Sequence, residues 1–310
     1  MTVFLPTQVL LEISNDGAQW LEPGPLENGF SLVAPSLATF NGRLWMAFID
    51  QNNVLNVASY GPGGPEGVNV FSGVSLVPGA SRAAPSLAVF NNKLWMAIIA
   101  NNTTNTLLLA SSSDGIAWSG FVGVPTPGNP GRSLTAPSLA SFNNKLWMAI
   151  VADNNTGTLL LASSPDGANW SAFAGVPGLS KAAPSLAAFD NKLWMAIIAD
   201  NKTNTLLLAS SSDGTTWSSF VGVPTPGNPG EGLIGPSLAA GNDRLWMAAV
   251  ANNPTATLLL ASSQDGMTWS NFFGALGAAS STGVSVGFDN LGQVCLAYAI
   301  PPSVTFQGGG

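Results

Sequence analysis

The chain has 310 residues, of which 46% are hydrophobic and only 8% are charged, and its formal net charge is −7. It contains no His and one Cys, which excludes catalysis by His, zinc or iron ligation by His, and an internal disulfide. Its few basic residues form no cluster that could hold phosphate backbones. Apolar runs last about seven residues, whereas a membrane-spanning helix needs roughly 20. We therefore expect neither nucleic-acid binding nor membrane insertion.

One pattern recurs along almost the whole chain, with a period of roughly 50 residues, which is typical of a β-propeller or a solenoid. In four copies, an Asp-Gly-x-x-Trp motif begins 19 residues after the Trp of a Leu-Trp-Met motif, and a fifth copy of the Asp-Gly motif opens the chain. A degraded sixth copy of Leu-Trp-Met, GQVCLAYAI, has Cys295 in the Trp position. The Leu-Trp-Met motifs place their Trp residues at Trp45, Trp95, Trp147, Trp194 and Trp246.

Each repeat contains four short apolar runs of strand length, bounded by Asn-Asn, Asp-Gly or Pro-Gly. Runs such as LWMAII are apolar at consecutive positions, so both faces of the sheet must be buried, which stacked blades achieve. Four strands make one propeller blade. In the second whole repeat the predicted strands are PSLAVF (85–90), LWMAIIA (94–100), TLLLASSS (106–113) and WSGFVGV (118–124).

The two ends of the chain complement each other. Residues 9–20 supply the third and fourth strands of a repeat, and residues 283–300 supply the first and second. Joining them closes a ring without an open edge, whereas a solenoid would cap its ends separately. We predict an all-β, six-bladed β-propeller of four-stranded antiparallel blades, with one blade shared between the N- and C-termini. The chain is expected to form one domain, 1–310, with blades near 34–76, 84–127, 136–178, 183–226, 235–276, and 283–300 closed with 7–24.

The Asp-Gly motif suits a tight hairpin, because Asp can accept hydrogen bonds from amides two residues on and Gly adopts positive φ. The Trp that follows begins the next strand and is expected to be buried. Cys295 is expected to be a buried packing residue. We assign structural roles to Asp16, Asp114, Asp166, Asp213, Asp265, Trp20, Trp118, Trp170, Trp217 and Trp269.

Polar residues recur directly after the second strand, on the side of the disc opposite the Asp-Gly turns. Basic residues near the start of the first strand are expected on the same side. Such groups can form paired hydrogen bonds with vicinal hydroxyls, although Asn and Asp also simply favour turns. The candidate ligand-binding residues are Asp50, Asn101, Asp153, Asp200 and Asn252, together with Arg82, Arg132 and Lys181.

The turn Ser-x-Asp-Gly-x-x-Trp resembles the Asp-box of sialidase-like propellers, and the near-identical blades resemble the propeller lectins of bacteria, fungi and invertebrates. An Asp-box usually has one residue between Asp and Gly, and this chain has none. In that family the box is a rim turn away from the ligand, so the resemblance concerns the fold. A sialidase would also need an arginine triad and a Tyr–Glu nucleophile pair. Arg43 and Arg244 occupy equivalent turns of different blades and cannot converge.

We therefore expect a multivalent, lectin-like, carbohydrate-binding propeller that is not an enzyme and uses no cofactor or metal. One alternative is a scaffold that binds a protein partner through the VPTPGNPG loops, 124–131 and 223–230. A less favoured alternative is a glycoside hydrolase, which needs two carboxylates within several ångströms. No signal peptide is apparent, so we expect synthesis in a bacterial cytoplasm, with release or surface association left open.

Overall fold

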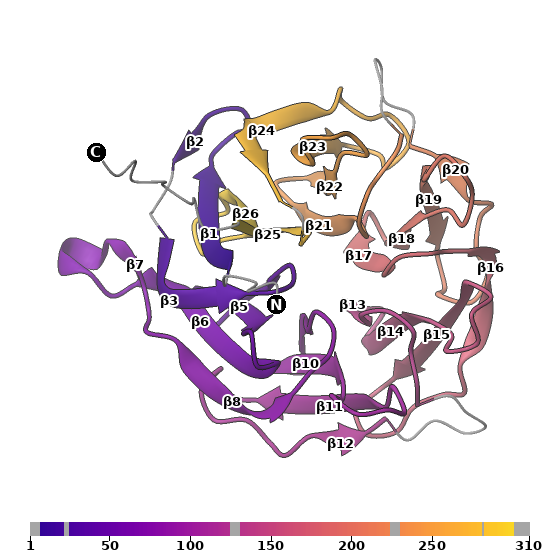
Figure 1. The fold of residues 1–310 in the computed structure, drawn as a ribbon, viewed down its shortest axis with the longest axis horizontal. Coiled ribbons are helices and arrows are strands. Elements are labelled where there is room, and N and C mark those ends of the chain that lie inside the picture. The colour runs from indigo at the N-terminus through magenta and orange to yellow at the C-terminus, as the bar shows by residue number, and fades with distance from the viewer. Residues whose placement is uncertain (1–6, 22–24, 125–130, 224–229, 281, 301–310) are drawn as a thin grey trace, which may run out of the picture.

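The computed structural model describes residues 7–21, 25–124, 131–223, 230–280 and 282–300. Six antiparallel sheets surround a central axis, each with its first strand nearest the axis (Figure 1). The predicted six-bladed propeller with one blade shared between the chain ends is therefore confirmed. No helix in the described part of the chain has the length and hydropathy of a membrane span.

Blades 1, 2 and 3 follow one another along the chain. Blade 1 contains β4 (Ser36–Phe40), β5 (Arg43–Ile49), β6 (Val54–Pro62), the short 3-10 helix η1 (Pro65–Gly67), β7 (Asn69–Phe71) and β8 (Ser75–Ala80). Blade 2 contains β9 (Ser86–Phe90), β10 (Lys93–Ile99), β11 (Leu107–Ser112) and β12 (Val122–Gly123). Blade 3 contains β13 (Ser138–Phe142), β14 (Lys145–Val151), β15 (Thr158–Ser164) and β16 (Ala174–Leu179).

Blades 4 and 5 continue this order, and blade 6 joins the two ends of the chain. Blade 4 contains β17 (Ser185–Phe189), β18 (Lys192–Ile198), β19 (Leu206–Ser211) and β20 (Val221–Gly222). Blade 5 contains β21 (Ser237–Gly241), β22 (Arg244–Val250), β23 (Thr257–Ser263) and β24 (Phe273–Ala279). Blade 6 contains β25 (Val284–Phe288), β26 (Val294–Ile300), β1 (Thr7–Ser14), β2 (Trp20–Leu21) and β3 (Pro25–Ser31).

The second strand of each blade forms the core, because neighbouring blades cover both of its faces. In β10, every side chain from Leu94 to Ile99 is at most 8% exposed. Trp95 contributes the largest ring of this strand, and its Nε1 donates a hydrogen bond to the Phe90 carbonyl at 3.0 Å. A consecutive apolar run is therefore buried on both sides, as the sequence pattern indicates.

Each of these Trp rings also packs against the Asp-Gly turn of another blade. A Cβ built on Gly214 would lie 2.1 Å from the Trp147 ring, and the φ of Gly214 is +78°. The glycine therefore serves both the left-handed turn and the close approach of the indole. The same contact joins Trp45 to Gly115, Trp95 to Gly167, Trp147 to Gly214, Trp194 to Gly266 and Trp246 to Gly17.

The fourth strand is shorter than predicted in blades 2 and 4, where it is two residues long. Trp118 forms only an isolated bridge with Ser112. In the preceding turn, Asp114 Oδ1 accepts hydrogen bonds from the amides of Ile116 and Ala117, both at 2.8 Å. Blades 3 and 5 have the same turn hydrogen bonds but fourth strands of six and seven residues, so this turn does not set the length of the strand.

The turn aspartates predict how stability depends on acid. Hydrogen bonds from the Thr268 and Met267 amides lower the pKa of Asp265 to about 2. The pKa values of the other four turn aspartates, Asp16, Asp114, Asp166 and Asp213, are also lowered by backbone amides. A lowered folded-state pKa stabilises the fold only while the carboxylate is charged. The contribution is thus full above the ordinary carboxyl pKa of about 4 and is lost as pH falls through the folded-state values.

We expect the urea midpoint of unfolding to be constant from about pH 7 to pH 5 and to fall between about pH 4 and pH 2. The variant Asp265→Asn should show a shallower fall. Glu27→Gln, an exposed change in β3, should leave the slope unchanged. An acid slope that is identical in wild type and Asp265→Asn would contradict this account.

The ring closes where β26 pairs with β1, over the seven positions from Gln8↔Ile300 to Ser14↔Val294. Next to this seam, Tyr298 donates its hydroxyl to Glu12 Oε1, and both side chains are at most 2% exposed. Cys295 is fully buried, as predicted, and burial raises the pKa of its thiol.

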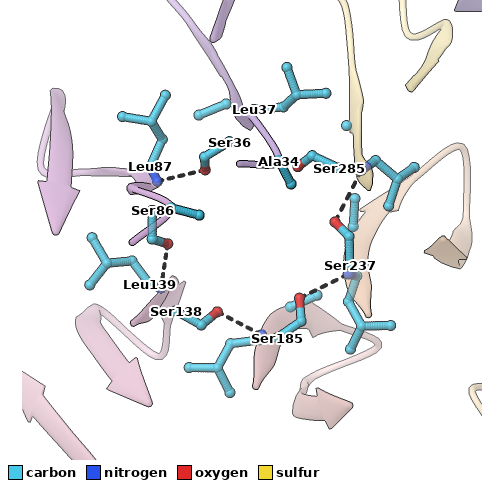
Figure 2. A pocket seen from close by; sticks show the side chains of 18 of the residues that line it. Ala34, Ser36, Leu37, Ser86, Leu87, Ser138, Leu139, Ser185, Ser237 and Ser285 are labelled. Atoms are coloured by element: carbon cyan, nitrogen blue, oxygen red, sulfur yellow. Dashed lines mark hydrogen bonds between the residues drawn. The ribbon is translucent and has the colours of Figure 1, made fainter. Parts of the chain in front are cut away.

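Serine hydroxyls link the inner strands around the axis (Figure 2). Ser86 Oγ, for example, accepts a hydrogen bond from the Leu139 amide of the next blade at 2.9 Å. Among the described residues, no such bond joins Ser285 to Leu37, so the boundary between blades 6 and 1 lacks this link. Elsewhere the acceptors are Ser36, Ser86, Ser138, Ser185 and Ser237, at 2.9 to 3.0 Å.

Candidate functional site

The second-to-third-strand turns and the inter-blade connections lie on one side of the disc, which we call the loop face. The Asp-Gly turns and the first-to-second-strand turns lie on the opposite side, the hairpin face. Isolated bridges such as Ser133↔Ala152 tie each connection to the end of the second strand. Four predicted ligand residues consequently occupy equivalent, exposed positions on the loop face of blades 2 to 5, namely Asn101, Asp153, Asp200 and Asn252.

These loop-face groups make contacts that differ from blade to blade. Asn252 Nδ2 donates to Glu231 Oε2 at 3.2 Å, and Glu231 is not among the predicted ligand residues. An isolated bridge pairs Arg132 with Thr106 of blade 2. The other two predicted cations serve the turns themselves, since Arg82 donates to Asn105 Oδ1 and Lys181 donates to Asn204 Oδ1.

Asp50 does not share the position of the other four. Its turn is shorter by two residues, and Asp50 Oδ1 accepts hydrogen bonds from the amides of Asn52 and Val54 at 2.8 and 2.9 Å. The Asp50 amide donates to the Val54 carbonyl, as the Ala100 amide does to Thr106 in blade 2. The predicted five-blade ring is therefore a four-blade ring, and Asp50 forms its own turn.

None of the eight predicted ligand residues lines either of two cavities, an axial channel and a pocket on the hairpin face. The larger cavity, of about 970 Å³, is the axial channel, and the inner strands of all six blades form its wall. The predicted partner loops, 124–131 and 223–230, lie largely outside the described residues. Binding at the eight residues and at these loops stays a prediction.

The second cavity is a pocket of about 530 Å³ on the hairpin face, between blades 4 and 5, which we call the acidic pocket. Two exposed carboxylates from consecutive blades line it, Asp190 and Asp243, together with Gln264. The pocket shares Gly241 and Asn242 with the axial channel, so the two cavities adjoin.

The acidic pocket forms where blade 4 departs from the repeat. In blades 1 to 3 the first turn residue is Asn, whose Nδ2 donates to a carbonyl in the Asp-Gly turn of the next blade, as Asn143 does to Ser212 at 3.4 Å. Blade 4 has Asp190 at this position. A carboxylate cannot donate, so the link to the equivalent residue, Gln264, is absent and the two blades leave a pocket between them.

A second departure from the repeat adjoins the first. Blade 5 ends its first strand with Gly241, where blades 1 to 4 have Phe. The ring of Phe288 from blade 6 occupies the space beside Gly241 and lies 2.6 Å from a Cβ built on that glycine. Both irregularities are visible in the sequence as departures from the repeat, but the sequence does not show that they adjoin one pocket.

Other acidic groups near the axis are occupied or buried. Asp289 lines the channel but is 3% exposed, and its Oδ1 accepts hydrogen bonds from the Leu291 and Gln293 amides. The Tyr298–Glu12 pair lies between blades, out of reach of a substrate. Within the described ranges, no three His, Cys, Asp or Glu side chains gather as a metal site would require.

Solved structures with this fold include carbohydrate-processing enzymes. An α-L-arabinofuranosidase from Fusarium graminearum, solved with an iminosugar inhibitor, has a TM-score of 0.65 and 12% identity over 96% of this chain and 98% of its own. An α-L-arabinanase from Penicillium chrysogenum, solved with arabinobiose, has a TM-score of 0.64 and 12% identity over 94% and 98%. A mutant Trypanosoma rangeli sialidase with trans-sialidase activity has a TM-score of 0.57 and 14% identity over 96% and 58%.

No protein-family model and no curated protein sequence matches the chain. At these identities the structural comparisons establish the fold, which is that of the sialidase-like and arabinanase-type six-bladed β-propellers.

The prediction of a non-catalytic, lectin-like propeller is wrong, because the similar propellers named above are enzymes that cleave or transfer sugars. The chain lacks the arginine triad and the Tyr–Glu pair of a sialidase, but a glycoside hydrolase needs only two carboxylates. Asp190 and Asp243, which were not among the predicted site residues, are brought to one pocket by the fold.

Proposed function

We propose that the protein hydrolyses a glycosidic bond in the acidic pocket, with Asp190 and Asp243 as its two carboxylates. The observation that carries this proposal is that carboxylates from two consecutive blades line one pocket beside the axial channel. Glycoside hydrolysis requires such a pair, one on each side of the scissile bond.

The chemistry assigns a role to each member of the pair. One protonated carboxyl group donates its proton to the glycosidic oxygen as the C–O bond breaks. The other carboxylate either activates a water molecule or first bonds to the anomeric carbon, and water then completes the hydrolysis. The products are a sugar with a free anomeric hydroxyl and the released alcohol. Asn242 and Gln264 supply amide groups that can hydrogen-bond sugar hydroxyls beside the pair.

The comparisons support this proposal at the level of carbohydrate chemistry. The arabinofuranosidase, the arabinanase and the sialidase all act on glycans through this fold. Fold alone does not define an activity, so the proposal depends on the two carboxylates.

The test is an assay for released reducing ends on a panel of aryl glycosides and polysaccharides. We expect Asp190→Asn and Asp243→Asn each to lower kcat at least about a hundredfold, because each removes a group that transfers a proton or attacks in the transition state. Both side chains are exposed, so the thermal midpoint of unfolding should change little.

Two further variants locate the activity on one face. Glu27→Gln makes the same type of change on the outer strand β3 and should retain wild-type kcat. Asp153→Asn makes it on the loop face. Activity lost in Asp153→Asn but kept in Asp190→Asn would contradict the proposal and move the site to the loop face.

A further inference from the structure

The axial channel crosses the whole disc. Its wall runs from Ala34 and Ala84 on the loop face to Asn242 and Asp289 on the hairpin face, where it adjoins the acidic pocket. The channel has a volume of about 970 Å³, within the range of pockets that bind small ligands. A cavity of this size therefore adjoins the pocket that holds Asp190 and Asp243.

The wall of the channel is formed by strand edges, because each blade stands radially with its first strand innermost (Figure 1). In an antiparallel pair, alternate residues direct their N–H and C=O groups away from the partner strand. In β9, Leu87 and Val89 are the residues that face the axis in this way. The channel thus presents rings of backbone donors and acceptors.

The serine hydroxyls that link the inner strands accept hydrogen bonds from only some of the backbone amides that face the axis (Figure 2). Ser36 Oγ accepts the Leu87 amide at 2.9 Å, but within the described residues the next axis-facing amide, that of Val89, has no protein partner. In these contacts the serine oxygen accepts a hydrogen bond, so the hydroxyl hydrogen is left to donate elsewhere. In the described part of the chain, the hydroxyl hydrogens of Ser86 and Ser138 have no protein acceptor, although both residues are more than nine-tenths buried. Such groups must hydrogen-bond to water or to a ligand.

The channel is also almost free of charge. Asp289 is the only charged residue in its described wall, and the carboxylate of Asp289 is occupied by backbone amides. Alanine, proline and leucine side chains supply apolar contacts between the rings of polar groups. Fixed donors and acceptors without charge suit a ligand that carries many hydroxyl groups, whereas an anionic ligand would lose its hydration without gaining a cation.

We propose that the axial channel binds a single unbranched, uncharged glycan chain and directs one end of it to the acidic pocket. This inference rests on the proposed function, because the carboxylate pair gives the bound chain its reaction. It adds the substrate class: a neutral linear polysaccharide or oligosaccharide, attacked near a chain end.

Binding can be measured separately from cleavage in the double variant Asp190→Asn/Asp243→Asn. Calorimetry with neutral arabino-, xylo-, cello- and malto-oligosaccharides of two and six units is expected to show at least tenfold tighter binding of the hexamer in one series. A hexamer of galacturonic acid, which is linear but anionic, should bind at least tenfold more weakly than the neutral hexamer. Equal affinity for dimer and hexamer, or no binding of any neutral series, would overturn the channel assignment.

Two single variants, Ala84→Phe and Ala136→Phe, add a ring at equivalent positions of adjoining blades at the loop-face end of the channel, and both are made in the double-variant background. Each should weaken hexamer binding at least tenfold. The matched control Val122→Phe adds the same ring on the outer strand β12, where Val122 is 61% exposed, and should bind as the parent does. If either obstructed variant folds with the parent's thermal midpoint and binds the hexamer unchanged, the channel assignment is overturned.

The outcomes separate this inference from the proposed function. Length-dependent binding that the obstructing variants abolish supports the channel even if the wild-type protein cleaves no glycan, and that result would overturn only the proposed hydrolysis. Cleavage that depends on Asp190 and Asp243 without length-dependent binding would overturn only the channel.

Discussion

Replacing Gly214 by Ala is expected to lower the free energy of unfolding by about 2 to 5 kcal/mol. The φ of Gly214 is +78°, and a Cβ there would lie 2.1 Å from the ring of Trp147 in the neighbouring blade. A left-handed backbone costs a non-glycine residue roughly 1 to 2 kcal/mol, and overpacking adds about 1 to 3 kcal/mol. The measurement is equilibrium unfolding in urea at neutral pH.

Two companion variants identify the cause. Gly222→Ala makes the same change in the same blade, but no atom lies within 4 Å of its Cβ, so stability should change by less than about 0.5 kcal/mol. Trp147→Leu removes the indole from Gly214. In the double variant Trp147→Leu/Gly214→Ala, the glycine substitution should cost less than it does alone. Full additivity would show that the indole contact has no part in the requirement for glycine.

Replacing Tyr298 by Phe, next to the pairing of β26 with β1, is expected to lower the free energy of unfolding by about 2 to 3 kcal/mol. The change removes a hydroxyl that donates to Glu12 Oε1, and both side chains are at most 2% exposed. A buried carboxyl group that loses a donor in place keeps its desolvation penalty, which exceeds the net value of an ordinary hydrogen bond. The measurement is again urea unfolding, compared with Tyr60→Phe at a partly exposed site.

The double variant Glu12→Leu/Tyr298→Phe separates the polar pair from the packing of the ring. Replacing both partners with apolar side chains of similar volume removes the buried polar groups together, so stability should return to within about 1 kcal/mol of wild type. A double variant as unstable as Tyr298→Phe would mean that the seam depends on the geometry of this pair and not on satisfying a buried carboxyl group.

Most of the fold could be predicted from the sequence because the same strand and turn pattern recurs in each repeat. A run such as Leu94 to Ile99 is apolar at consecutive positions, and only a strand covered on both faces explains it. The half-repeats at the two ends imply the pairing of β1 with β26. The fourth strand was overestimated in blade 2, where it begins at Val122, four residues after Trp118.

The candidate site was harder to predict. The predicted ligand residues were those that recur in most blades, whereas the acidic pocket lies where the repeat is interrupted. The amides and carboxylates repeated on the loop face suggested a binding ring, yet none of them lines the axial channel or the acidic pocket. Asp190 and Gly241 interrupt the repeat in adjoining blades. Sequence spacing alone does not show that these two residues line the same pocket.

The sequence by itself determined the number of blades, the strand order and the closure of the ring, because periodic burial and turn chemistry act within each repeat of the chain. Only the tertiary structure decided which residues that depart from the repeat lie next to one another. Asp190 and Asp243 are 53 positions apart in the sequence and line one pocket because blades 4 and 5 stand side by side around the axis. The physical reason is that contacts between blades depend on the radial stacking of whole sheets, which no local pattern of residues encodes.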